Sequence, residues 1–155
     1  MIQRIQTLFL LLGIVACLVC VCFPIAELRG EGVTIPALMY NGCVVAEQGS
    51  SLAVASAVLI PLFALLVLAA AVGLWTIFTY KHRPRQMKLC MYAICLLVVW
   101  YATLAFVALT QMPEGATFHP LFATALPLLA ICLFALARRS IHKDEQLVRS
   151  ADRIR

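Results

Sequence analysis

The sequence has few charged residues, and long stretches of it have none. Only 12% of its 155 residues are charged, whereas 64% are hydrophobic, and the mean hydropathy is +1.00. A soluble domain is about a quarter charged, because polar groups must cover its surface. The composition therefore argues against a soluble domain and predicts a single integral membrane domain over residues 1–155.

The few charges lie between or beyond four apolar blocks, at residues 7–25, 52–80, 89–109 and 120–137. Each block is long enough to cross the roughly 30 Å hydrocarbon layer as a helix. Short connections between spans favour antiparallel neighbours. The predicted fold class is an all-α membrane protein, an antiparallel bundle of four transmembrane helices.

The interiors of these blocks contain no Asp, Glu, Lys, Arg or His. Proton-coupled carriers, pumps and voltage sensors place such groups inside the membrane as part of their mechanism. Small multidrug exporters, for example, depend on a membrane-buried glutamate. The sequence therefore argues against an ion-driven or proton-driven carrier.

The cations are distributed unevenly along the chain. All of them except Arg29 lie in the N-terminal leader, in the loop between the second and third blocks, or in residues 138–155. Cytoplasmic segments of membrane proteins carry an excess of Lys and Arg. We therefore expect a multi-pass protein whose N-terminus, middle loop and C-terminus are cytoplasmic.

The positions of the cations also indicate what they contact. The net charge of +5 could suggest nucleic acid, but the cations flank the apolar blocks, where lipid headgroups lie. The expected partner is therefore a bilayer with anionic headgroups, and nucleic acid is not expected. Six cations are predicted to contact anionic lipid: Lys81, Arg83, Arg85, Lys88, Arg138 and Arg139.

The outer segment at residues 26–51 is polar and contains a turn signal. Asn41 and Gly42 lie between two short runs, at residues 34–40 and 43–46, that are suited to strands. Asn-Gly favours a type I′ turn, in which both central residues have positive φ. We predict a small β-hairpin that rests on the helix ends.

Residues 138–155 are predicted to form a cytoplasmic amphipathic helix. Apolar residues recur there at helical spacing, and the candidate contact residues are Ile141, Leu147, Val148, Ala151 and Ile154. Two interpretations stay open. The helix lies on the anionic inner leaflet, or it docks on a cytoplasmic or membrane protein.

The seven cysteines do not suggest a disulfide framework, because six of them lie inside apolar blocks, where a thiol behaves as a small hydrophobe. Cys17 and Cys20 form a C-x-x-C motif, and Cys43 lies in the outer loop. Membrane thiol–quinone oxidoreductases also have four spans and a C-x-x-C motif, but they need a second cysteine pair. Buried structural cysteines are the favoured interpretation, and such an oxidoreductase is one alternative.

Trp100 and Tyr101 fall near the middle of the third block. A buried aromatic residue with a polar group needs a hydrogen-bond partner, and the candidate hydroxyls are Ser56, Thr103 and Thr124. A packed interior is the favoured interpretation, and the alternative is a carrier of lipid or a small hydrophobic molecule. No residue spacing is specific for a metal site, and no cofactor is predicted.

The two ends of the chain resemble a known family. The opening residues MIQRIQT (1–7) and the closing residues DEQLVRSADRIR (144–155) are similar to an uncharacterised family, domain of unknown function 4293. The resemblance implies a small four-helix protein of the bacterial inner membrane in Bacteroidota, with a cytoplasmic role for the tail. The family has no assigned activity.

These observations lead to one functional hypothesis. Uncharged spans, a basic loop and a patterned tail indicate a non-enzymatic accessory or scaffold subunit that acts through its basic cytoplasmic tail. Its expected partner is an unidentified membrane or cytoplasmic protein, or a second copy of the chain.

Overall fold

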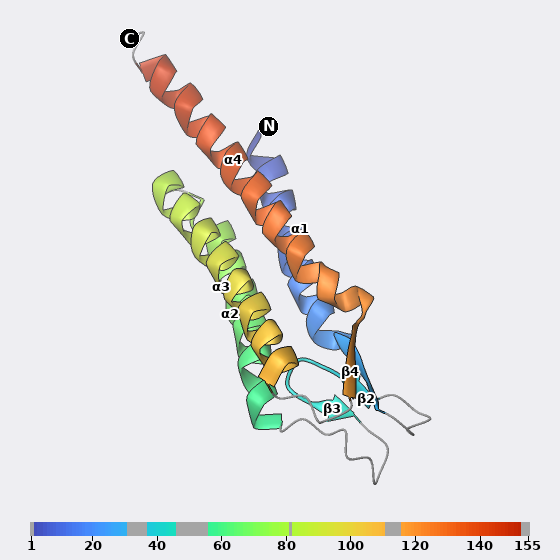
Figure 1. Ribbon diagram of the computed structural model, residues 1–155. Coiled ribbons are helices and arrows are strands. Elements are labelled where there is room, and N and C mark those ends of the chain that lie inside the picture. Colours follow the sequence, from blue (N-terminus) through green and yellow to red (C-terminus); the bar gives the residue numbers. More distant parts are fainter. Residues whose placement is uncertain (1, 31–36, 46–55, 81, 111–115, 153–155) are drawn as a thin grey trace.

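The computed structural model describes residues 2–30, 37–45, 56–80, 82–110 and 116–152. Within them four long helices lie along one another, with a small β-sheet at one end (Figure 1). The helices are α1 (Ile2–Cys22), α2 (Ser56–Phe78), α3 (Arg83–Thr110) and α4 (Leu126–Asp152). We call these four helices the helical body. The prediction of a mostly helical fold with four apolar helices is confirmed.

The helices pack as two close pairs, α1 with α4 and α2 with α3 (Figure 1). Contacts between α1 and α2, and between α3 and α4, join the two pairs. Both chain termini lie at the end of the helical body opposite the sheet. The helical body therefore has a sheet end and a terminal end.

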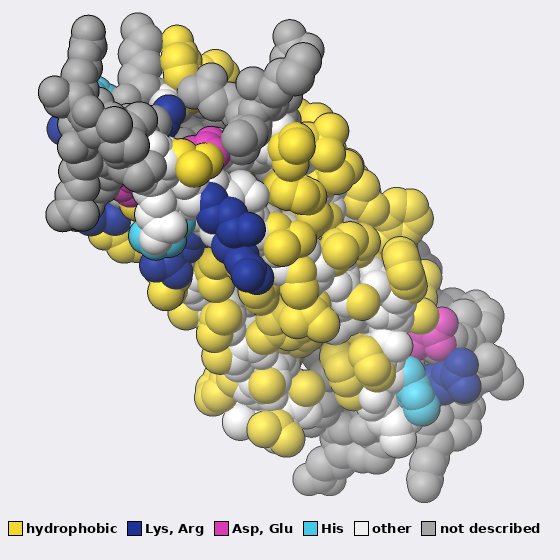
Figure 2. Space-filling view, turned by 90° about the horizontal axis from the view of Figure 1, so that it is seen from above, with side chains coloured by type: hydrophobic (Ala, Val, Ile, Leu, Met, Phe, Trp, Pro, Cys, Tyr) yellow, Lys and Arg dark blue, Asp and Glu magenta, His cyan; other side chains and the backbone are white. Residues whose placement is uncertain are grey.

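Within the described residues, each helix provides a segment long and apolar enough to cross a membrane, namely Ile5–Cys22, Leu59–Phe78, Arg83–Thr110 and Phe122–Leu147. Between 28% and 39% of each segment is buried inside the protein, so most of its apolar surface faces outward. Figure 2 shows a hydrophobic middle with charged side chains gathered toward the two ends. An apolar surface of this extent needs a lipid or protein cover.

Two prolines mark helix starts. Pro84 is the second residue of α3, which begins inside the basic segment expected to be a loop. Pro127 is the second residue of α4, after the 3₁₀ turn η1 (Phe122–Ala125), so α4 begins later than residue 120, where the fourth apolar block begins. Proline is favoured in the first helical turn because the backbone N–H that it lacks would have no partner there.

The predicted tail helix is the C-terminal half of α4. Residues 138–152 continue α4 without interruption, and in Figure 1 this end of α4 extends beyond the other helices. No glycine or proline follows Pro127, so the sequence contains no signal that would end the helix.

The sheet has four antiparallel strands, in the order β3-β2-β1-β4. They are β1 (Ala26–Gly30), β2 (Ala37–Met39), β3 (Val44–Val45) and β4 (Ala116–Pro120). The β2–β3 hairpin confirms the predicted one, whose first residues, 34–36, and last residue, 46, lie outside the described part. Strands β1 and β4 replace expected loops and pair from Ala26 opposite Pro120 to Gly30 opposite Ala116.

The predicted type I′ turn is wrong. Gly42 has a φ of 107°, but no described residue other than glycine has a positive φ, so Asn41 does not have the left-handed conformation that type I′ requires. Positive φ at only the second central residue is typical of type II. The Asn41 side chain instead makes hydrogen bonds inside the protein, as described below.

Candidate functional sites at the two ends of the helical body

At the sheet end, Asn41 connects the hairpin to two helices. Its side chain is 6% exposed. The amide nitrogen Nδ2 donates to the backbone oxygen of Cys20 on α1 (2.9 Å), and Oδ1 accepts from Nε1 of Trp100 on α3 (3.2 Å). One buried amide therefore joins the β2–β3 turn, α1 and α3.

Trp100 and Tyr101 have different partners. The two rings meet edge to face, with centroids 4.9 Å apart. The hydroxyl of Tyr101 donates to the backbone oxygen of Thr124 (2.6 Å), and the Thr124 hydroxyl donates to the backbone oxygen of Ile25. The expected hydroxyl partner for Trp100 was wrong, because the turn brings an amide to it from outside the helices.

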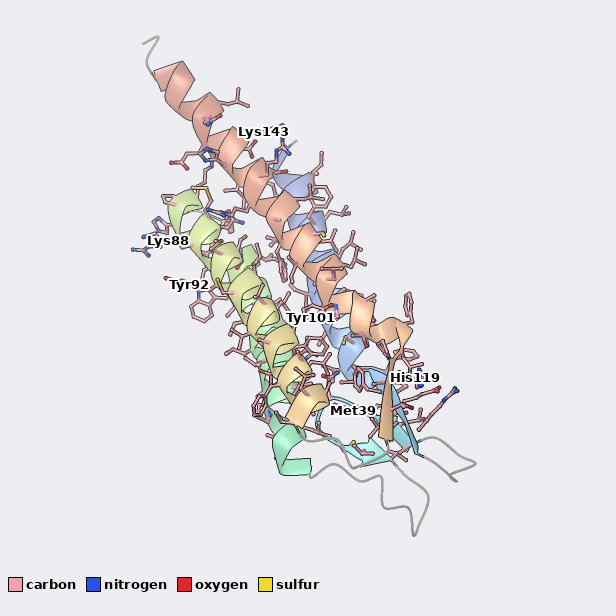
Figure 3. All side chains as sticks on the ribbon, viewed as in Figure 1. Met39, Lys88, Tyr92, Tyr101, His119 and Lys143 are labelled. Atoms are coloured by element: carbon pink, nitrogen blue, oxygen red, sulfur yellow. The ribbon has the colours of Figure 1, made fainter. Side chains whose placement is uncertain are left out.

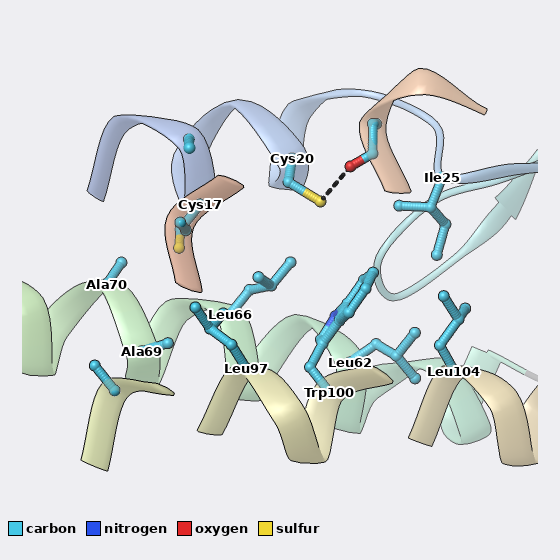
Figure 4. Close-up of a cluster of buried hydrophobic side chains, with 14 of the residues drawn as sticks. Cys17, Cys20, Ile25, Leu62, Leu66, Ala69, Ala70, Leu97, Trp100 and Leu104 are labelled. Atoms are coloured by element: carbon cyan, nitrogen blue, oxygen red, sulfur yellow. Dashed lines mark hydrogen bonds between the residues drawn. The ribbon is translucent and has the colours of Figure 1, made fainter. Parts of the chain in front are cut away.

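The cysteines of the C-x-x-C motif lie in the interior of the protein. Cys17 and Cys20 are buried, whereas Cys43 is exposed beside the turn, and all three are free thiols. The Cys20 thiol donates to the backbone oxygen of Ala123 (3.3 Å), facing the apolar cluster around Trp100 (Figure 4). At this position Cys20 contributes to packing between α1 and η1.

An apolar groove of about 310 Å³ lies at the sheet end, between the end of α1 and the start of α4. Its lining residues are Val19, Phe23, Pro24, Leu121, Phe122, Ala123 and Leu126. Trp100 and Tyr101 do not line it, so this groove is not the cleft that the carrier hypothesis placed around them.

The terminal end contains a buried carboxylate. Asp144 is 9% exposed, and its side chain accepts a hydrogen bond from the amide of Gln6, which is also buried. Arg83, at the start of α3, donates to the backbone oxygen of Asp144 (3.5 Å). Asp144 therefore ties α4 to α1 and to the beginning of α3.

Another groove lies at the terminal end, between α3 and α4, and has a volume of about 280 Å³. Its lining residues are Met87, Ile94, Ala135, Arg138, Arg139 and His142. The guanidinium of Arg138 lies 3.2 Å from the sulfur of Met91. The described residues contain no cluster of His, Cys, Asp and Glu suited to a metal ion.

The family model for Domain of unknown function (DUF4293) matches residues 2–154. The chain belongs to this family. The match covers nearly the whole chain and confirms the resemblance that its two ends suggested. No match was found among curated proteins.

In this DUF4293 protein, the two ends that carry the resemblance touch each other. Gln6 belongs to the opening segment MIQRIQT, Asp144 begins the closing segment DEQLVRSADRIR, and the two side chains are hydrogen-bonded. Asp144 was not among the contact residues predicted for the tail. Its position one turn after Ile141, on the same helix face, was the signal that could have placed it at the core.

The predicted contact residues of this DUF4293 protein lie in different environments. Ile141 is buried and belongs to the core, whereas Leu147 is 59% exposed. The side chains of Val148, Ala151 and Ile154, and all of Lys81, lie outside the described part. Among the cations, Arg85, Lys88, Arg138 and Arg139 are exposed and Arg83 is half-buried.

Figure 3 shows which labelled side chains lie at each end of the helical body. Lys88 and Lys143 lie toward the terminal end, and Met39 and His119 lie at the sheet end. Tyr101 lies between them along the helical body. The cations of α3 and α4 are therefore gathered at the end of the protein that also holds both termini.

Proposed function

We propose that the protein spans the bacterial inner membrane as an antiparallel four-helix bundle, with its sheet outside and both termini in the cytoplasm. The four apolar segments and their outward-facing apolar surface support the membrane location. The gathering of Lys and Arg at the terminal end supports the orientation.

Within this arrangement, the protein acts as a non-enzymatic accessory or scaffold subunit that presents the end of α4 to a cytoplasmic partner. The observation that carries this proposal is the unbroken course of α4 past Asp144, where Gln6 and Arg83 hold it. About 12 Å of helix follows Asp144, at 1.5 Å per residue. A helix held in this way points away from the helical body, which favours a protein partner over a tail lying flat on the leaflet.

The buried residues of α4 decide where we cut the tail. Removal of everything after Arg139 would delete Ile141 and Asp144, which are buried. A stop after Gln146 keeps both residues and removes Leu147 and all that follows. The tagged protein and this truncated form are extracted in a mild detergent, and the proteins that co-purify are identified by mass spectrometry.

We expect the full chain to retain a partner at a fixed ratio and the truncated form to lose it. Leu147→Asp should have the same effect, because its side chain is exposed on the projecting part. The matched control is Gln146→Asp, an exposed neighbour about 100° away around the helix. A partner that the truncated form retains, or recovery of the chain alone, would count against the proposal.

A further inference from the structure

The groove between α3 and α4 at the terminal end combines two kinds of surface. One part is apolar, from Met87, Ile94 and Ala135, and the other part carries Arg138, Arg139 and His142. Met87 and Ile94 are seven positions apart on α3, and Ala135 and His142 are seven positions apart on α4, so the groove follows about 10 Å of each helix. A ligand that fits along it must have a charged end and an apolar end.

The charged residues that line the groove determine whether it favours an anion or a cation. Both arginines are exposed, and none of the described residues that line the groove is a carboxylate. Neither arginine takes part in the ion pair of Arg29 with Glu27, which lies at the other end of the protein. Two exposed arginines on one groove favour an anion, and phosphate accepts charge-assisted hydrogen bonds from arginine.

The groove also lies across the boundary between apolar and polar sequence. Ala137 is the last residue of the apolar run of α4 before Arg138, and on α3 the apolar run begins at Leu89, after Met87 and Lys88. Both helices therefore change from apolar to cationic at the level of the groove. In a bilayer this is the level of the phospholipid headgroups, where basic pockets between helices bind anionic lipids.

We propose that this groove binds one anionic phospholipid of the inner leaflet. The lipid phosphate lies between Arg138 and Arg139, with His142 beside it, and the first carbons of an acyl chain lie along Ala135 and Ile94. The rest of the lipid stays in the bilayer, because the groove holds only about 280 Å³. The inference rests on the proposed membrane location and adds a ligand class to it.

The test uses the full-length protein, purified in a neutral detergent and freed of lipid. Native mass spectrometry counts the bound lipid during titration with phosphatidylglycerol, and with phosphatidylcholine of the same acyl chains. We expect one phosphatidylglycerol per chain to bind ahead of phosphatidylcholine. The double variant Arg138→Gln with Arg139→Gln should weaken phosphatidylglycerol binding roughly tenfold or more, since it removes two charge-assisted contacts.

The matched control removes two positive charges elsewhere at the same end. Arg85 and Lys88 are exposed on the first turns of α3 and do not line the groove. The contact predicted for Arg85 and Lys88 is with the headgroup surface of a bilayer, which the protein in detergent lacks. The variant Arg85→Gln with Lys88→Gln should therefore change the affinity for the single lipid less than about twofold, because exposed charges outside the groove contribute little. An equal loss in both double variants would mean diffuse attraction and would overturn the proposal.

A third variant tests the groove itself. Ala135→Phe leaves every charge in place but fills the apolar part, and Ala135 is exposed, so the fold should tolerate it. We expect this variant to lose the single bound phosphatidylglycerol. Retained binding would show that the lipid does not bind in the groove. Displacement of the lipid by an equal concentration of inorganic phosphate would instead show a site for free anions.

The lipid test and the partner test fail independently. The truncation after Gln146 removes no residue of the groove, so loss of a partner says nothing about lipid binding. Lipid binding in detergent also does not depend on which way the protein faces in the membrane. A protein that keeps its partner site but shows no preference for phosphatidylglycerol would contradict only the inference drawn here.

Discussion

The two ends of the helical body differ in whether their polar side chains are paired inside the protein or exposed. At the sheet end, Asn41, Trp100 and Tyr101 make neutral hydrogen bonds inside the protein, and their partners belong to α1, α3 and η1. At the terminal end, one buried carboxylate accepts a hydrogen bond from an amide and half-buried Arg83 donates to its backbone oxygen. Arg85, Lys88, Arg138 and Arg139 are exposed there.

The difference shows which end stabilises the fold and which is available for binding. A polar group buried away from water needs an internal partner, and at the sheet end those partners come from segments far apart in the sequence. The exposed cations at the terminal end are available to lipid or protein. Changes at the sheet end should therefore affect stability most, and changes at the terminal end should affect binding most.

The largest expected effect is at the sheet end. Trp100→Ala removes a fully buried ring and leaves the Asn41 side chain without its donor. We expect a loss of about 3–5 kcal/mol in the free energy of unfolding, the usual cost of emptying such a site. Unfolding by a denaturing detergent, followed by circular dichroism, measures it.

The control for Trp100 is the other tryptophan. Trp75 is 69% exposed on α2, so Trp75→Ala should change the free energy of unfolding by less than about 0.5 kcal/mol. Equal losses in the two variants would show that the interior around Trp100 is not specifically packed.

A smaller loss is expected from Asn41→Ala. This change leaves the Trp100 indole N–H and the Cys20 backbone oxygen without their partner. Unpaired buried groups of this kind cost about 2 kcal/mol, measured by the same unfolding assay. Cys43→Ala, at an exposed position two residues away, should be close to neutral, and a comparable loss there would point to the turn backbone instead.

Breaking the hydrogen bond between Gln6 and Asp144 at the terminal end should lower the free energy of unfolding by less still. A double-mutant cycle with Gln6→Ala and Asp144→Ala isolates the coupling between the two side chains. We expect a coupling of about 1 kcal/mol, a typical net value for one hydrogen bond. Lys143→Ala, at an exposed neighbouring residue, is the control, and a coupling near zero would mean that the termini are held together by other contacts.

The smallest perturbation is a label that tests which end faces outward. Cys43 is exposed at the sheet end, and Cys17 and Cys20 are buried. The other exposed thiols, Cys22, Cys95 and Cys132, belong to the apolar segments, where lipid would cover them. A membrane-impermeant maleimide added to intact cells should label the protein, and Cys43→Ser should abolish the labelling. Labelling that requires broken cells would reverse the proposed orientation and leave the stability comparison unchanged.

Much of the fold could be predicted from the sequence because the signals were local. Long apolar runs predicted four helices, and Asn41-Gly42 predicted the hairpin. The pairing of β1 with β4 could not be predicted, because about ninety residues separate the two strands and each is only five residues long. The alternation of buried Ala26 and Leu28 with more exposed Glu27 and Arg29 was the available strand signal.

The candidate sites were predicted less well. Trp100, Tyr101, Arg138 and Arg139 stood out in the sequence, but their surroundings could not be predicted from it. Nothing along the chain indicated that Asn41 would reach Trp100, or that α3 and α4 would form a groove between them. Both features depend on how the helices pack.

The sequence by itself determined the apolar segments, the uneven distribution of the cations and the family, because composition and order along the chain are enough to define them. Only the tertiary structure decided which polar groups meet: Asn41 with Trp100, and Gln6 with Asp144. The physical reason is that a buried polar group binds whatever partner the packing of distant segments brings near it. That packing also left Arg138 and Arg139 exposed on the groove that α3 and α4 share.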